Sequence, residues 1–274
     1  MTAPKTGGTP YDARIRRTEH LTTTYPFAAE FLELYRSVAG FQKNLFQQLA
    51  SASGKTAILA GAHRGEVDLT QLLPHFRGFL SLIGQRGPAA LAESAKQISV
   101  LPSEAWIALL TAYWQHAGLY DQQIGAFAQF FPRAFLQPYI ELLAARTPKP
   151  PLTTTPSFCP LCGARPLLGV LRPEGDSGKR FLFCSFCSYE WDFRRILCPT
   201  CGEETEAKLP VYVAEQFPHV RVECCDTCKF YLRTIDLTKD GHAVPLVDDL
   251  AAIPLTLWAH EHSYSRLQPN LLGT

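Results

Sequence analysis

Four closely spaced pairs of cysteines carry the clearest chemistry in this sequence. Each pair has the spacing Cys-x-x-Cys, and the pairs are Cys159/Cys162, Cys184/Cys187, Cys198/Cys201 and Cys225/Cys228. Two thiolates on one tight turn can point at a single ion, and a tetrahedral ion needs two such turns. The separations between the pairs match those of zinc-ribbon and rubredoxin-like sites, so the sequence predicts eight ligands around two metal ions.

An internal repeat indicates which pairs share an ion. CPLCG at 159–163 and CPTCG at 198–202 are the same turn, whereas CSFCSYEW at 184–191 and CDTCKFYL at 225–232 both lack the glycine. This tandem repeat favours sequential pairing, with the first two pairs around one ion and the last two pairs around the next. The alternative is an interleaved cross-brace, in which the first and third pairs share an ion.

The identity and role of the metal stay open at this level. Four thiolates suit zinc and iron equally, and their spacing does not distinguish the two. A structural role is the simplest expectation, because a structural zinc contributes roughly 10–16 kcal/mol of apparent binding energy in small modules. An iron pair that passes electrons is the alternative. The ninth cysteine, Cys224, has the wrong spacing for a ligand turn and is predicted to lie in a strand.

Charge and hydropathy limit the classes of protein to consider. The chain has 274 residues, with 26 Lys and Arg against 25 Asp and Glu. In 157–240 acidic residues slightly outnumber basic ones, and each four-thiolate site with a divalent ion adds a charge of about −2. A nucleic-acid-binding zinc ribbon is therefore only a weak alternative. No signal peptide or membrane-spanning run is evident, so we expect a cytoplasmic protein with no membrane partner.

The elements that precede the cysteines are predicted to be helices. Apolar residues recur every three or four positions over 26–52, from Phe27 and Phe31 to Leu45 and Leu49, which is typical of one helical face. A second such segment runs from Leu69 to Ile83, and further helices are predicted near 88–99, 103–116 and 121–145. Breaks are expected at Pro132 and Pro138, because proline interrupts helical hydrogen bonding.

These patterns divide the chain into five parts. We expect a helical domain over 1–146, a Pro/Thr-rich linker over 147–157, four-cysteine modules over 158–196 and 197–240, and a helical tail over 241–274. In the tail, Leu250, Ile253, Leu257 and Trp258 lie on one side, and Pro254 bends the helix or marks its first turn. The predicted fold class is α+β and multidomain, with two rubredoxin-like or zinc-ribbon modules followed by a C-terminal helix. No combination of nucleophile and base is evident, so we do not expect an enzyme.

Beyond spacing, the C-terminal half contains four more specific segments, which are CPLCG, CSFCSYEWDFRRILCPTCG, ECCDTCKFYLRTIDL and the closing VDDLAAIPLTLWAHEHSYSRLQPNLLGT. In these segments the chain resembles the FdhE family of formate dehydrogenase accessory proteins. These motifs cover roughly the last 120 residues, and all eight ligand positions of the family are filled here.

The resemblance implies a cytoplasmic maturation factor that is not an enzyme. Its implied partner is the catalytic, molybdenum- or tungsten-dependent subunit of formate dehydrogenase, bound before assembly or export, and iron is the implied metal, with zinc as the alternative. A rubredoxin-like redox protein is the alternative function. As partner contacts we expect side chains on or near the second cysteine turn and in the tail: Tyr189, Trp191, Arg194, Asp248 and Asp249.

Overall fold

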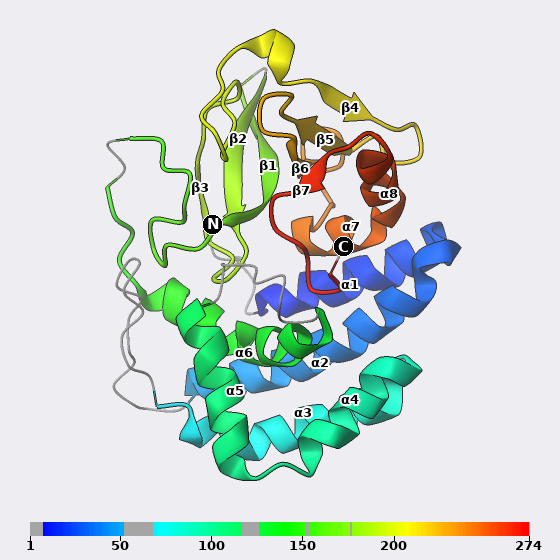
Figure 1. Ribbon diagram of the computed structural model, residues 1–274, viewed down its shortest axis with the longest axis vertical. Coiled ribbons are helices and arrows are strands. Elements are labelled where there is room, and N and C mark those ends of the chain that lie inside the picture. The colour runs from blue at the N-terminus through cyan, green and yellow to red at the C-terminus, as the bar shows by residue number, and fades with distance from the viewer. Residues whose placement is uncertain (1–7, 52–67, 117–125, 152–153, 176, 274) are drawn as a thin grey trace.

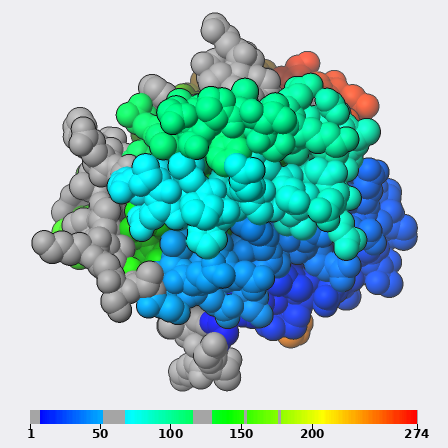
Figure 2. Space-filling model, turned by 90° about the horizontal axis from the view of Figure 1, so that it is seen from below, coloured from blue at the N-terminus to red at the C-terminus, as the bar shows by residue number. Residues whose placement is uncertain are grey.

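The structure is a computed structural model that describes residues 8–51, 68–116, 126–151, 154–175 and 177–273. A helical half is followed by a sheet that carries the cysteines, and a short helix of the tail lies between the two (Figure 1). The helices of the first half are α1 (Pro10–Thr24), α2 (Ala29–Ser51), α3 (Leu73–Arg86), α4 (Ala89–Ser99), α5 (Ser103–His116) and α6 (Ala126–Arg146). Figure 2 shows α2, α3, α4 and α5 side by side over the end of the molecule away from the sheet. None of the described helices is both long and apolar enough to cross a bilayer.

The helix α1 has no counterpart among the predicted elements. Its N-terminus carries a capping box, in which Asp12 accepts a hydrogen bond from the Thr9 backbone at 2.7 Å, and such reciprocal bonds satisfy otherwise unpaired donors. The face that α1 buries includes Arg14, Arg17 and Thr18 as well as Tyr11. Because polar side chains occupy the buried face, the helix lacks the apolar stripe from which it would have been predicted.

The helix α2 confirms the predicted helical segment but not all of the predicted face. Leu34, Val38 and Leu45 are buried, whereas Phe27 is 57% exposed and Phe31 is 38% exposed. Phe27 belongs to the short 3-10 turn Pro26–Ala28 that precedes α2. The tighter twist of this turn carries Phe27 out of the apolar stripe, whereas Phe31 lies in α2 itself, at the edge of the buried face.

The predicted breaks at Pro132 and Pro138 are wrong, because both prolines lie inside the continuous helix α6. Pro138 has no N–H to offer the carbonyl of Ala134, four residues earlier. The side chain of Gln42 supplies the missing donor, with 2.6 Å between Gln42 Nε2 and the Ala134 carbonyl oxygen. A hydrogen bond from a neighbouring helix therefore replaces one that the proline removes. The predicted start of this helix, at residue 121, lies outside the described residues.

Both cysteine modules contribute to one sheet. Its strands are β1 (Pro166–Glu174), β2 (Ser177–Cys184), β3 (Glu190–Asp192), β4 (Val211–Val213), β5 (Val220–Cys224), β6 (Phe230–Asp236) and β7 (Ser265–Arg266). Among the described strands the order is β3-β2-β1-β6-β5-β4, with β7 beside β6. Each module supplies three antiparallel strands in the same sequence, and the parallel pair of β1 and β6 joins them. The modules are thus continuous through backbone hydrogen bonds.

The junction between β1 and β6 requires a glycine. Gly169 lies opposite Thr234, and a Cβ atom at residue 169 would lie only 2.2 Å from Thr234 Oγ1. Any larger residue at this position would have to displace the Thr234 side chain on the neighbouring strand.

The tail forms two short helices rather than one. They are α7 (Pro245–Ala251) and α8 (Ile253–Glu261), and Pro254 lies in the first turn of α8, where its missing N–H has no helical partner to lose. Leu257 is 60% exposed, so it does not share the buried side expected for it. One apolar cluster packs α7 against α1 and α2 through Val247, Leu21 and Leu32.

Candidate metal centres

All four cysteine turns have the same backbone geometry. In each turn the N–H of the first cysteine donates to the carbonyl five residues later. The pairs are Cys159 with Ala164 (2.8 Å), Cys184 with Tyr189 (2.9 Å), Cys198 with Glu203 (2.9 Å) and Cys225 with Phe230 (3.0 Å). The repeat seen in the sequence is therefore also a repeat of structure.

A residue with positive φ ends every one of these turns. Gly163 and Gly202 fill this position in the first and third turns, with φ of 71° and 75°. Ser188 and Lys229 fill it in the second and fourth, with φ of 57° and 60°. Glycine adopts this region without strain, whereas other residues lose roughly 1–2 kcal/mol there. The turns that lack glycine in the sequence thus adopt the same conformation at some energetic cost.

The first cluster gathers Cys159, Cys162, Cys184 and Cys187. The Sγ atoms of Cys159 and Cys187 are 3.6 Å apart, those of Cys162 and Cys184 are 3.4 Å apart, and those of Cys162 and Cys187 are 3.6 Å apart. A disulfide bond is only about 2.05 Å long, whereas four sulfurs at about 2.3 Å from a tetrahedral ion are separated by about 3.8 Å. The arrangement therefore fits four ligands around one ion.

The second cluster gathers Cys198, Cys201, Cys225 and Cys228 in the same way. The Sγ atoms of Cys198 and Cys228 are 3.7 Å apart, and those of Cys201 and Cys225 are 3.6 Å apart. Each cluster thus combines two consecutive turns, as the tandem repeat indicates, and the interleaved arrangement is not observed. Zinc and iron both accept such a donor set, so the geometry does not identify the metal.

The first cluster lies in the interior of the protein. All four of its cysteines belong to an apolar core shared with the helices, and the Phe186 ring lies 5.7 Å from that of Trp114 on α5. Burial raises the pKa of Cys184 and Cys187 well above the usual range. Without a cation, an apolar interior would keep these thiols protonated. A bound ion is what would hold four thiolates together here, so its binding is coupled to folding.

The second cluster lies closer to solvent. Cys201 is exposed and Cys228 is partly exposed, whereas Cys198 and Cys225 are buried. The turn that bears Cys201 is linked to the fourth turn through Glu203, whose carboxylate accepts a hydrogen bond from Thr227 Oγ1 at 2.6 Å. This bond joins the two halves of the cluster from its solvent side.

Cys224 belongs to neither cluster. It is the last residue of β5 and is buried, as its spacing predicts. Burial, with smaller contributions from Asp226 and Cys225, raises the pKa of the Cys224 thiol to about 12. A thiol with so high a pKa stays protonated at neutral pH, and the protonated form is the less reactive one.

Three of the residues expected to contact a partner are inside the protein. Trp191 is 1% exposed, and its Nε1 donates to the Pro156 carbonyl at 2.8 Å. Asp248 and Asp249 are also buried. The structure thus corrects this part of the expectation, because side chains enclosed by the protein do not form a docking surface. Tyr189 is partly buried, and Arg194 is exposed, with Nη1 2.7 Å from a Glu204 carboxylate oxygen.

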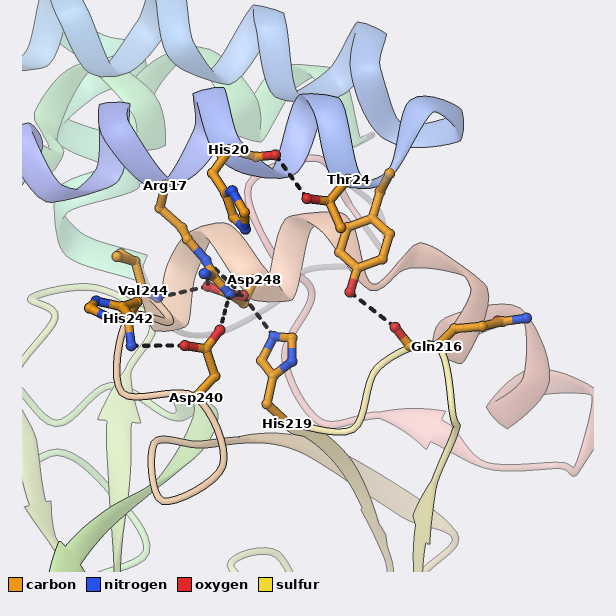
Figure 3. Close-up of polar contacts among 10 residues, drawn as sticks. Arg17, His20, Thr24, Gln216, His219, Asp240, His242, Val244 and Asp248 are labelled. Atoms are coloured by element: carbon orange, nitrogen blue, oxygen red, sulfur yellow. Dashed lines mark hydrogen bonds and ion pairs between the residues drawn. The ribbon is translucent and has the colours of Figure 1, made fainter.

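Asp248 is the centre of a polar network that the sequence does not reveal (Figure 3). Arg17 Nε lies 3.1 and 3.0 Å from the two carboxylate oxygens of Asp248, and His219 Nε2 lies 2.8 Å from one of them. The Val244 backbone N–H donates to the other oxygen at 2.7 Å. His219, Asp240 and Asp248 together offer donors close enough for a cation. The Arg17 guanidinium already occupies that position, so we interpret the group as a structural ion-pair network.

Asp249 forms a second buried network beside the first. Its carboxylate lies 2.8 Å from Arg233 Nε and 2.7 Å from Arg266 Nη2, and it accepts a hydrogen bond from Asn270 at 3.1 Å. Consecutive aspartates of α7 therefore face two different parts of the fold: Asp248 pairs with α1, and Asp249 pairs with β6 and the end of the chain.

Two family models match adjacent parts of the cysteine-containing region. They are described as the FdhE central domain, which matches residues 158–195, and the FdhE C-terminal domain, which matches residues 196–272. The crystal structure of the FdhE protein from Pseudomonas aeruginosa is similar over 96% of this chain and 95% of its own, with 26% identity and a TM-score of 0.70. The chain belongs to the FdhE family.

Relatives named as FdhE homologues extend the similarity. The one from Aquifex aeolicus is 26% identical over 251 residues, which are 90% of this chain and 87% of the relative. One from Pseudomonas aeruginosa is 37% identical over 125 residues, which are 44% of this chain and 40% of the relative. Membership of the FdhE family supports an accessory role to formate dehydrogenase, and the two cysteine clusters could each hold a metal ion.

Proposed function

We propose that this FdhE protein binds the catalytic, molybdenum- or tungsten-dependent subunit of formate dehydrogenase before that subunit is assembled or exported. The observation that carries the proposal is the pair of four-cysteine clusters in the region that both FdhE family models match. A protein that binds another protein benefits from a rigid surface, because the entropy lost in ordering a flexible surface would reduce the affinity. Metal-bound turns on a continuous sheet supply such rigidity.

The two clusters would have different roles, one structural and one in partner binding. The first cluster packs into the helical core, and Ser188 Oγ, which follows its last cysteine, donates to Glu141 of α6 at 2.6 Å. It would therefore fasten the modules to the helices. The second cluster has the exposed Cys201, so it is the cluster that a partner would contact.

We propose iron as the ion in both clusters and the cytoplasm as the compartment. The family resemblance favours iron, and four thiolates are ligands that it accepts. All nine cysteines lie in the described residues and none of them forms a disulfide bond, which agrees with a reducing compartment. Elemental analysis of protein purified without oxygen tests the first point, and two zinc ions per chain would contradict it.

Co-purification tests the proposed partner. A tagged catalytic subunit of formate dehydrogenase is expressed with this chain in a strain that lacks its own copy, and we expect the two to elute together. The Cys201→Ser variant should weaken the association, whereas Cys224→Ala, which alters a cysteine outside both clusters, should not. The proposal fails if nothing elutes with the wild-type chain and formate dehydrogenase activity is normal without it.

A redox role is the second candidate, because the exposed second cluster would let an iron exchange electrons with a partner. Visible absorption before and after dithionite tests this role. A spectrum that does not respond to reductant would exclude it.

A further inference from the structure

The strand β4 forms one edge of the sheet (Figure 1). Just before it, the Pro210 carbonyl accepts a hydrogen bond from the Cys224 N–H of β5 at 2.9 Å. In an antiparallel pair only alternate residues exchange such bonds with the neighbouring strand. The N–H and C=O groups of Val211 and Val213 therefore point away from β5, and no other strand of the described residues lies on that side.

The side chains of β4 are apolar or aromatic, and all of them are exposed. Val211, Tyr212 and Val213 are 43%, 39% and 55% exposed. Proteins commonly protect the edge of a sheet with charged side chains, and none of these three carries a charge. An edge of this kind pairs readily with an additional strand, whose backbone hydrogen bonds give affinity and whose alternate side chains give specificity.

Apolar surface lies on both faces of the sheet at this edge. On one face, Val211 lines a pocket of about 350 Å³ together with Ile196, which is 44% exposed. On the other face, the centre of the Tyr212 ring lies 4.6 Å from that of Trp258 on α8, and Leu257, the neighbour of Trp258 in sequence, is 60% exposed. Successive side chains of an added strand point to opposite faces, so both surfaces accept side chains from it.

The pocket suits an aliphatic side chain. The arginines that line it, Arg180 and Arg221, already lie 2.6 Å from Glu223 and 3.8 Å from Asp236. Most of the other walls are apolar, and they include Leu171, Ile196, Leu197, Leu209, Val211 and Leu232. Burial of one aliphatic side chain against such walls contributes roughly 1.5–3 kcal/mol, so the pocket would anchor one residue of an added strand.

The charge around this edge is negative. Four glutamates and three basic residues lie in 194–215, and the second cluster, which borders the pocket through Cys198 and Cys225, adds about −2 with a divalent ion. Glu206 precedes β4 and Glu215 follows it, and both are exposed and form no ion pair with another described residue. These charges favour a basic segment and oppose a second copy of this chain, whose edge carries the same glutamates.

We propose that the β4 edge binds, as an additional strand, an extended segment of a partner protein that alternates aliphatic and basic residues. The aliphatic side chains lie on the face of the pocket. The basic side chains lie on the opposite face, beside the Tyr212 and Trp258 rings, because aromatic faces attract cations. The inference rests on the proposed function only in that the chain acts by binding another protein, and it places the bound segment beside the second cluster.

Fluorescence polarisation with the metal-loaded full chain tests the proposal. The probe is a fluorescein-labelled peptide of sequence Lys-Val-Lys-Val-Lys-Val-Lys with blocked ends, and the comparison probe has glutamate in place of each lysine. We expect saturable binding of the lysine probe and binding of the glutamate probe that is weaker by about tenfold or more, because like charges across an interface repel. Equal binding of the two probes, or no saturable binding of the lysine probe, would overturn the proposal.

Two variants of one residue connect the binding to the strand edge. Val213→Pro removes an N–H that points away from β5, and an edge strand tolerates proline at such a position. It should weaken binding of the lysine probe by about tenfold or more, because the outward donor is lost and the proline ring lies where the added strand would approach. Val213→Thr is the matched control, because it keeps the N–H and the branched shape, and it should bind as the wild type does.

Circular dichroism and metal content report whether each variant folds. Equal binding by the wild type and a folded Val213→Pro variant would place the probe elsewhere and overturn the proposal. Sedimentation of the wild-type chain tests the other occupant: a dimer that Val213→Pro abolishes would show that a second copy covers the edge, and the proposed occupant would be wrong. These outcomes do not depend on formate dehydrogenase, so they are independent of the co-purification that tests the proposed partner.

Discussion

Arg17 and Asp248 are 231 residues apart in the chain, yet the Nε–H of Arg17 reaches both carboxylate oxygens of Asp248. Arg17 Nη2 also lies 2.6 Å from Asp240, so one guanidinium holds α1 against the turn before α7 and against α7 itself. The charges of Arg17 and Asp248 are both buried. Each therefore depends on the other for the solvation that water no longer provides.

Replacement of Arg17 by methionine should destabilise the protein strongly. Removing one partner of a buried ion pair leaves the other charge uncompensated, which costs about 3–5 kcal/mol. Denaturant unfolding of the metal-loaded protein measures this change. Arg16→Met is the matched control, because Arg16 is on the same helix and exposed, and its effect should stay within about 0.5 kcal/mol. A small effect at Arg17 would show that the network does not hold α1 in place.

Metal should leave the two clusters at different rates. A chelator reaches an ion only when its ligands are exposed or the structure opens locally, and the first cluster lies in the core whereas the second exposes Cys201. We expect one equivalent of metal to be released at least about tenfold faster than the other, which corresponds to about 1.4 kcal/mol of difference in opening free energy.

Variants assign the two phases of metal release. Cys201→Ser should remove the fast phase and keep the slow one, because it disrupts only the second cluster. Cys162→Ser should instead reduce helical content together with metal, since its cluster is part of the shared core. A single rate for both ions in the wild-type protein would contradict the proposed difference.

Cys224 should resist alkylation in the native protein. Because its pKa is raised to about 12, roughly one thiol in ten thousand is ionised at pH 8. The thiolate is the reactive form, so the rate with iodoacetamide should rise about tenfold for each pH unit between 7 and 9. Mass spectrometry of native and denatured protein measures it, and the denatured chain serves as the reactive reference. Labelling of native Cys224 as fast as in the denatured chain would contradict its burial.

The Gln42 side chain should stabilise the fold through α6. Gln42→Leu leaves the buried Ala134 carbonyl without its donor, which should cost about 1–3 kcal/mol. Gln48→Leu, an exposed change on the same helix, is the control and should be nearly neutral. The difference between the two unfolding free energies gives the contribution of this single bond. If both variants unfold alike, the carbonyl must find another donor.

Local rules predicted the cysteine turns well because ligand spacing is a short-range property. The two clusters and the helical N-terminal half follow from residues close together in the sequence. The positive φ of Ser188 and Lys229 could also be inferred, since each stands where the repeat has Gly163 or Gly202. In all four turns the hydrogen bond from the first cysteine N–H to the carbonyl five residues later imposes this left-handed conformation.

Features that depend on distant residues could not be predicted in this way. The continuity of α6 through Pro138 depends on Gln42, and the burial of Asp248 and Asp249 depends on arginines of α1, β6 and β7. Acidic residues in a tail normally favour solvent. Only the tertiary arrangement shows that these two are enclosed and paired with opposite charges.

The parallel pairing of β1 with β6 also constrains the order in which the chain matures during its synthesis. Val170 and Leu171 of β1 are synthesised first. Their partners on β6, Ile235 and Asp236, leave the ribosome some 65 residues later. Until then the nascent first module keeps an open strand edge, which is a template for aggregation. If the first module binds its metal ion early, it can fold before β6 is synthesised. The open edge of β1 would then belong to a folded module, which reduces the risk of aggregation.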